Sequence, residues 1–330
     1  MNLNKFVYYF TFGSMVFFTN IGAIGNSLSL FILTRKQFRK ISMFRYYTLS
    51  VILDSIQIIL MWSYSFPEAF SLHRFKYACK TLQYLGFLVF QINALLNVVI
   101  SIDRYMNVKY AYKYLIRNKF KFQIIVFLII ILLSSGFCFS YFYFSEIIFV
   151  FNTTYCGIRD PFIRLYTNST DTFFAVLLPF FIMSSLTCVT GCSLIKQKMS
   201  LNKIKFDKEI QMLKLLLVMD FLFVLSNLPI ALYSIINNIL NIQGKYPSYM
   251  KVVYTITDFF VYLYSSCSFF VHFSCNKNFR KYTLEMVCMQ PVNKGQIQEN
   301  HRVRAAVSQI GRLQQTVSYK NKESSATLRR

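Results

Sequence analysis

Hydrophobic residues in this chain form long runs that are separated by short basic segments. A helix needs about 20 apolar residues to cross a bilayer core about 30 Å thick. Five runs of that length contain no charged residue, namely 6–34, 81–102, 122–145, 172–195 and 221–244, and two more, 43–66 and 252–276, each contain a single acid, Asp54 or Asp258. The pattern predicts seven membrane-spanning helices, at about residues 6–34, 43–66, 77–106, 122–145, 172–197, 209–241 and 249–275.

The segment after the last run changes character. Residues 277–288 are amphipathic and predict a short helix lying along the membrane surface. Residues 289–330 are polar and basic without apolar periodicity, which predicts a disordered cytoplasmic tail. The fold class expected is an all-α membrane protein, with a seven-helix domain over residues 1–288.

Composition supports a membrane protein rather than a nucleic-acid binder. The chain is 55% hydrophobic, and its net charge of +23 comes from basic residues between the apolar runs. Basic residues are enriched in cytoplasmic loops. Counting them puts the N-terminus outside and the C-terminus in the cytoplasm. The glycosylation acceptors Asn152 and Asn168 then fall in the one long outer loop, which agrees with this topology.

Several spaced motifs resemble those of rhodopsin-like (class A) G-protein-coupled receptors. Asp103-Arg104-Tyr105 ends the third run, and Cys79 lies 25 residues before Arg104. Asn26 follows a glycine in the first run, and Asp54 lies 28 residues after Asn26. These residues and spacings are similar to that family's. The resemblance implies a plasma-membrane receptor with no catalytic activity of its own, whose partners are an extracellular ligand and a heterotrimeric G protein.

The activation residues implied by the resemblance depart from the usual pattern. Asn227 stands in place of the tryptophan in an FxxxWxP-like segment with Phe223 and Pro229. Ser268 and His272 replace the asparagine and tyrosine of NPxxY, and Thr187 stands where the fifth helix usually has tyrosine. Pro229 removes a helix hydrogen bond, so we expect either a pivot or a purely structural kink there. The relay from ligand to G protein is therefore expected to be unusual.

Arg104 needs an anionic partner because an unpaired guanidinium at the membrane edge is costly. Asp103 lies beside it, and the resemblance makes Glu209 its partner across the bundle. We expect a latch between the third and sixth helices that exposes Arg104 to the G protein when it opens. The alternative is an arginine that extends to the interface among counter-charges.

A second buried acid, Asp54, is expected to face the bundle interior. The resemblance implies an allosteric sodium site with Asn26, Asn93 and Ser268. The alternative is a neutral, hydrogen-bonded carboxyl. No other metal or cofactor is predicted. Asp220 has no equivalent in the common family pattern.

The ligand pocket predicted from the sequence comprises Gly86, Phe87, Asp258 and Tyr262. Gly86 stands where amine receptors have aspartate, and Tyr262 where opsins have lysine, so amine and light-sensing roles are disfavoured. Asp258 either contacts a basic ligand group or pairs with Lys251 or Arg74.

The expected ligand is a peptide, and the alternative is a small chemosensory molecule. Outer basic residues, among them Arg164, favour a large or acidic partner. A transporter or channel is the rival class.

Two cysteine predictions complete the set. The resemblance implies a disulfide between Cys79 and Cys156, on the oxidising outer side where such bonds persist. Cys288 closes the amphipathic segment and is a palmitoylation candidate. Further partners expected are the lipid bilayer, and arrestin and receptor kinases at the tail.

Overall fold

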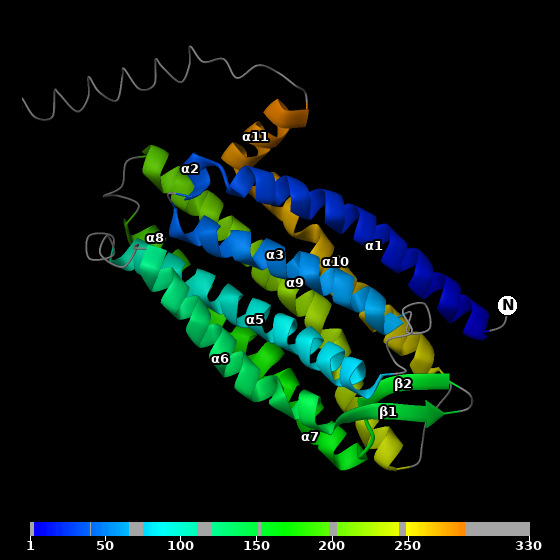
Figure 1. Cartoon of the computed structure of the whole chain (residues 1–330). Helices are drawn as coiled ribbons and strands as arrows, with labels where there is room; N and C mark the ends of the chain where they lie inside the picture. Colours follow the sequence, from blue (N-terminus) through cyan, green and yellow to red (C-terminus); the bar gives the residue numbers. More distant parts are fainter. Residues whose placement is uncertain are drawn as a thin grey trace, which may run out of the picture. The chain divides into compact units, whose positions relative to one another are not determined.

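A computed structural model of the chain describes residues 3–39, 41–65, 75–110, 120–150, 153–197, 203–243 and 249–287. Within these residues, seven long helices pack side by side (Figure 1). They are α1 (Leu3–Leu33), α3 (Ser42–Ser65), α5 (Lys76–Lys109), α6 (Phe120–Phe144), the continuous run α7 (Pro161–Asp171), η3 (Thr172–Leu177) and α8 (Leu178–Gln197), then α9 (Lys203–Ile242) and α10 (Met250–Cys275). The all-α class predicted from the sequence is confirmed.

Four short elements accompany the bundle. These are α2 (Lys36–Arg39), the antiparallel strands β1 (Ser145–Val150) and β2 (Thr153–Ile158), and α11 (Lys277–Val287). Contacts divide the chain into one unit up to Arg280 and a second from Lys281 onward. In the second unit the described residues continue α11 as far as Val287, where Lys281 Nζ lies 3.8 Å from Glu285 Oε1. The predicted helix at 277–288 is therefore helical through Val287.

The third long helix, α5, lies at the centre of the bundle. It packs against α3, α6 and α8 and also contacts both strands. On the two sides of this centre, α1 packs against α3 and α10, and α9 packs between α8 and α10. Side chains along α5, from Cys79 to Arg104, are thus positioned to meet residues from most of the other helices.

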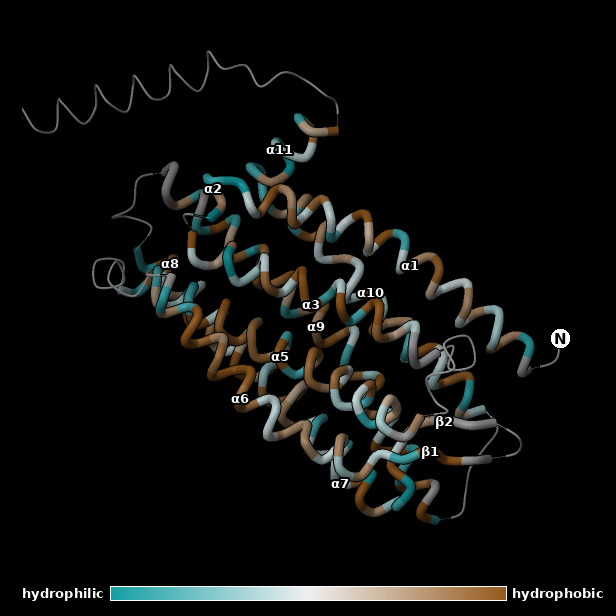
Figure 2. Tube along the Cα trace, in the orientation of Figure 1, coloured by the Kyte–Doolittle hydropathy of each residue, from teal (hydrophilic) through white to brown (hydrophobic). Residues whose placement is uncertain are grey.

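The helices carry their apolar side chains outward as well as inward. On α6, large aliphatic residues such as Ile125 and Leu132 are more than half exposed, and Figure 2 shows hydrophobic positions along most of this helix. Polar residues such as Asn26, Asp54 and Ser266 are buried instead. A hydrocarbon solvent favours this distribution, because it accepts apolar surface and cannot hydrogen-bond polar groups.

Of the seven long helices in the described part of the chain, six are long and apolar enough to cross a membrane. The seventh, α10, is 26 residues long but carries Lys251, Asp258 and several serines. Ser265, Ser266 and Ser268 are buried in the bundle interior. Their polarity lowers the hydropathy of α10 without exposing polar groups to lipid.

The fifth helix begins eleven residues earlier than predicted, at Pro161 rather than at 172. Asp160 caps this start, because its carboxylate accepts hydrogen bonds from the backbone N–H groups of Phe162 and Ile163. Proline suits the first helical position, which needs no donor. The added turns are amphipathic and contain no long apolar run, so the hydrophobic pattern did not predict them. Asn168 consequently lies on a helix and not in an exposed loop.

A wider turn interrupts the fifth helix between α7 and α8. In η3 the backbone follows a π-helical pattern, and Leu178 N–H donates to Phe173 O, five residues back. Pro179 has no N–H for the next carbonyl, that of Phe174. Gln91 of α5 supplies the missing donor, with Nε2 at 3.3 Å from Phe174 O. The bulge is thereby tied to the central helix.

The loop predicted between the fourth and fifth spans contains a β-hairpin. Ile147 of β1 pairs with Cys156 of β2, and both strands contact α5. We call the end of the bundle that carries this hairpin the hairpin end, and the opposite end, where Arg104 lies, the Arg104 end.

Candidate functional site

The Arg104 end is closed by an ion pair between two helices. Arg104 of α5 donates from Nη2 to Glu209 Oε2 of α9, and both side chains are largely buried, at 7% and 23% exposure. The pair compensates a charge that would be costly to bury alone. It also holds α5 against α9 at this end.

The other residues of the Asp103-Arg104-Tyr105 motif have different contacts. Asp103 accepts hydrogen bonds from Ser42 Oγ, at 2.7 and 2.8 Å, and from Asn107 Nδ2 at 3.0 Å. It thereby joins α5 to the start of α3. Tyr105 is half-buried, and its hydroxyl accepts a 2.6 Å hydrogen bond from Lys109 Nζ.

A polar layer crosses the middle of the bundle near Asp54. Asn93 Nδ2 donates to Asp54 Oδ1 at 2.8 Å, and Ser50 Oγ donates to Asn93 Oδ1 at 2.7 Å. Asn26 bridges α1 to α10: its amide donates to Ser265 O at 3.4 Å and accepts from Ser268 Oγ at 3.5 Å. Carboxylate and hydroxyl oxygens suit a sodium ion, but Asn93 presents its amide nitrogen to Asp54. Sodium binding stays a prediction.

A buried carboxylate whose partner the sequence did not reveal lies between the fifth and sixth helices. Asp220 of α9 accepts a 2.8 Å hydrogen bond from Thr187 Oγ1 of α8. Thr187 stands where the family usually has tyrosine, and Asp220 is the acid without an equivalent in the common family pattern. These two unusual residues therefore hydrogen-bond to each other. Recognising this contact required the α8–α9 register, which no local pattern encodes.

The candidate switch residues lie at two levels. Phe223 packs edge-on against Tyr264, with ring centroids 5.8 Å apart, and Asn97 Nδ2 donates to the Tyr264 hydroxyl at 2.6 Å. Closer to the Arg104 end, the buried His272 ring meets Tyr47 edge-on at 4.5 Å. Neither ring nitrogen of His272 has a hydrogen-bond partner within the part of the chain described. Pro229 lies inside α9.

At the hairpin end the bundle contains a partly open cavity of about 410 Å³. All four residues of the predicted pocket line it, namely Gly86, Phe87, Asp258 and Tyr262. A neighbouring cavity of about 250 Å³ shares part of this lining, including Phe87, Asp258 and Tyr254. The two are therefore branches of one chamber, which we call the ligand chamber.

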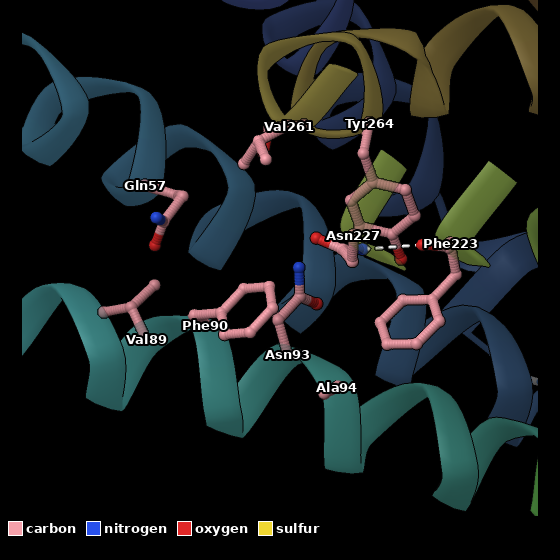
Figure 3. A pocket seen from close by; sticks show the side chains of 10 residues that line it. Gln57, Val89, Phe90, Asn93, Ala94, Phe223, Asn227, Val261 and Tyr264 are labelled. Atoms are coloured by element: carbon pink, nitrogen blue, oxygen red, sulfur yellow. Dashed lines mark hydrogen bonds between the residues drawn. The ribbon is translucent and has the colours of Figure 1, made fainter. Parts of the chain in front are cut away.

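The floor of the ligand chamber is formed around Asn227. This side chain is 1% exposed, and Nδ2 donates to Phe223 O of its own helix at 2.8 Å. Together with Asn93 and Tyr264, Asn227 lines a space of about 10 Å³, which is about what one water needs. Figure 3 labels these three side chains among those lining the space. The residue that replaces the expected tryptophan thus stands between the chamber and the polar layer.

The roof of the chamber is the hairpin, fastened by a disulfide. Cys79 near the start of α5 is bonded to Cys156 of β2. Gln83 Nε2, one turn further along α5, donates to Cys156 O at 3.0 Å. Cys156 and Gln83 both line the larger branch.

One acid in the chamber was not predicted. Asp171, at the junction of α7 and η3, lines the smaller branch together with Tyr141 and Asn168. Asn168 Oδ1 accepts a 3.3 Å hydrogen bond from the Tyr141 hydroxyl, so this sequon asparagine faces α6. Asp171 was not predicted to line the chamber, because the sequence pattern placed residues 161–171 in a loop and not on a helix.

Asn152, Arg74, Cys288 and the tail lie outside the described residues.

A bundle of long apolar helices with a buried polar interior, a chamber at one end and an ion pair at the other is the architecture of a multi-pass membrane protein. The family model described as 7 transmembrane receptor (rhodopsin family) matches residues 25–268. The chain therefore belongs to the rhodopsin family of seven-transmembrane receptors. No curated protein matches it.

Proposed function

We propose that the protein is a plasma-membrane receptor that binds an extracellular ligand in the ligand chamber and activates heterotrimeric G proteins. In this proposal the N-terminus and hairpin end face outside, and the Arg104 end faces the cytoplasm. The observation that carries it is the Arg104–Glu209 pair, which closes one end of α5 and α9. The same two helices line the chamber at the other end.

The proposed mechanism is a shift between two pre-existing arrangements of α9. Asn227 contributes to the chamber floor, and Pro229, two residues nearer the hairpin end, lacks the donor that would fix the backbone there. A ligand that favours a different packing at Asn227 would move the segment carrying Phe223 and, further along, Glu209. Separation of Glu209 from Arg104 would then expose the guanidinium to the G protein.

For the ligand we propose a peptide whose end enters the chamber. A small chemosensory molecule is the second candidate, because 410 Å³ lies within the usual range for small-molecule sites. Arrestin and receptor kinases stay predictions for the tail.

Nucleotide exchange tests the coupling directly. Purified full-length receptor in lipid nanodiscs is mixed with heterotrimers of each G-protein class, and GTP uptake is followed with wild type, Arg104→Ala and Lys196→Ala. Lys196 is an exposed basic residue in the last turn of α8. We expect Arg104→Ala to lower exchange about tenfold or more and Lys196→Ala to change it far less. Equal exchange by Arg104→Ala and wild type, or no exchange with any class, would contradict the proposal.

A further inference from the structure

We propose that the ligand chamber recognises a cationic group, an amine or a guanidinium, held between Asp171 and Asp258. The inference rests on the proposed function only in taking this chamber as the ligand site. It extends the sequence-based alternative that Asp258 contacts a basic ligand group, by adding a second acid, Asp171, that the sequence did not indicate.

The charged side chains that the structure describes in the chamber lining are all acidic. Asp258 lines both branches and Asp171 lines the smaller one, and no Lys, Arg or His among the described residues lines either. Among the described residues, neither carboxyl has a basic side chain within salt-bridge distance, so Lys251 is not the partner of Asp258. Arg164 likewise does not line the chamber. Carboxylates at membrane depth are costly without a counter-charge, and a ligand cation would supply one.

Both carboxyls line the chamber with hydrogen-bonding capacity to spare. Tyr262, one turn further along α10 than Asp258, lines the larger branch with it, and Tyr141 of α6 lines the smaller branch with Asp171. Asp171 Oδ2 is buried and has no hydrogen-bond partner in the described structure. A carboxylate accepts about four hydrogen bonds, so both acids have room for a donor from a ligand.

Aromatic rings line both branches of the chamber beside the two acids. Phe87, Phe90 and Tyr254 line both branches, and Tyr262 and Tyr141 each line one. Phe87 stacks on Tyr141 with ring centroids 3.7 Å apart and planes inclined by 12°. Aromatic faces attract cations, most strongly where water is displaced. Two acids among aromatic rings form a site suited to an amine or guanidinium with an apolar neighbour.

The backbone next to Asp171 departs from a regular α-helix. The residue immediately precedes the π-helical turn η3, whose Thr172 and Val176 also line the chamber. Such turns are rare and concentrate at functional sites, because they redirect side chains along a helix. Here the turn is tied to α5 through Gln91, which fixes the side of the fifth helix that faces the chamber.

Binding of defined probes tests the proposal without G protein. The peptide probe is the dipeptide amide Phe-Arg-NH2, compared with its neutral analogue acetyl-Phe-citrulline-NH2, in which both cationic groups are replaced by neutral amide or urea groups. The small-molecule probe is 2-phenylethylamine, compared with 2-phenylethanol. Binding is measured as the rise in Tm of purified full-length receptor at probe concentrations up to about 10 mM, where a Kd near 1 mM is still detected.

We expect at least one cationic probe to stabilise the receptor and its neutral analogue to do so at least about tenfold more weakly. Whether the peptide or the small amine binds more tightly distinguishes the two sources of the cation. Stabilisation by neither cation, or equal stabilisation by a cation and its neutral analogue, would overturn the proposal.

Variants locate the effect within the chamber. Asp258→Asn and Asp171→Asn should each weaken binding of the cation about tenfold, whereas Asp258→Glu keeps the charge and should retain most of it. Glu146→Gln is the matched control, because this β1 acid lies outside the chamber lining. Unchanged binding in both Asn variants, or an equal loss in Glu146→Gln, would contradict the assignment. Exchange by the ligand-free receptor tests coupling separately, so the two proposals fail independently.

Discussion

The two ends of the bundle handle charge in opposite ways. At the Arg104 end, Arg104 is paired with Glu209, and Asp103 accepts hydrogen bonds from Ser42 and Asn107. At the hairpin end, Asp171 and Asp258 line a chamber in which the structure describes no basic lining residue. One end has its charges compensated internally, whereas the other is suited to receive its counter-charge from outside. In the proposed function, the first arrangement is a releasable restraint and the second is a receptive site.

The sixth helix connects the two ends. It carries Glu209 at the Arg104 end, Asp220 against Thr187 in between, and Asn227 at the chamber floor. Glu209 joins α9 to α5 and Asp220 joins it to α8, whereas Asn227 lines the chamber. Substitutions along this helix and at the chamber roof therefore separate the contributions of the two ends.

Loss of the roof disulfide should have the largest effect. Cys156→Ser removes a cross-link over 77 residues of sequence, which we expect to lower the free energy of unfolding by about 2–5 kcal/mol. Cys188→Ser, at an exposed free cysteine of α8, is the control and should be near neutral. Thermal unfolding of purified receptor measures both. A Cys156→Ser variant as stable as the control would show that the hairpin end does not depend on its cross-link.

Packing near the polar layer should be less tolerant than packing at the hairpin end. A Cβ at Gly25 would lie 3.0 Å from Phe269 Cβ, whereas a Cβ at Gly13 would meet nothing within 4 Å. Gly25→Val should therefore destabilise the receptor by about 3 kcal/mol, because α1 and α10 must separate. Gly13→Val, compared in the same unfolding experiment, should leave stability nearly unchanged. Equal losses would argue against this contrast.

The Thr187–Asp220 contact should depend on hydrogen bonding more than on charge. Thr187→Val leaves the buried Asp220 carboxyl without its donor, and we expect a loss of about 1–2 kcal/mol. Asp220→Asn keeps an acceptor for the Thr187 hydroxyl and should cost less. The ranking is checked by thermal unfolding of both variants. A larger loss in Asp220→Asn would mean that the carboxylate charge itself is used.

Much of the fold followed from the apolar runs, because lipid-facing helices need long stretches without charge. The elements that were missed are those whose pattern is mixed. The amphipathic turns of α7 and the strands β1 and β2 carry no comparable run, so the prediction placed a loop there. The polar α10 was recognised despite its hydropathy, because a single acid interrupts an otherwise uncharged stretch.

At the candidate site, residues within spaced motifs were easier to place than residues that meet only in three dimensions. The spacing between Cys79 and Arg104 fixed the depth of α5 and hence the level of Gly86 and Phe87. Asp171 could not be assigned, since it approaches Asp258 only through the packing of the fifth helix against the bundle. The partner of Asp220 was missed for the same reason.

The latch between α5 and α9 is the central claim, and nucleotide exchange without ligand tests it most directly. Glu209→Gln removes the charge that pairs with Arg104, whereas Asp207→Asn removes an exposed acid two residues earlier on α9. Full-length variants in nanodiscs are compared with wild type on the G protein to which it couples best. We predict that Glu209→Gln raises basal exchange about threefold or more, because the restrained state loses its ion pair, and that Asp207→Asn matches wild type. Basal exchange by Glu209→Gln no higher than that of Asp207→Asn would contradict the latch.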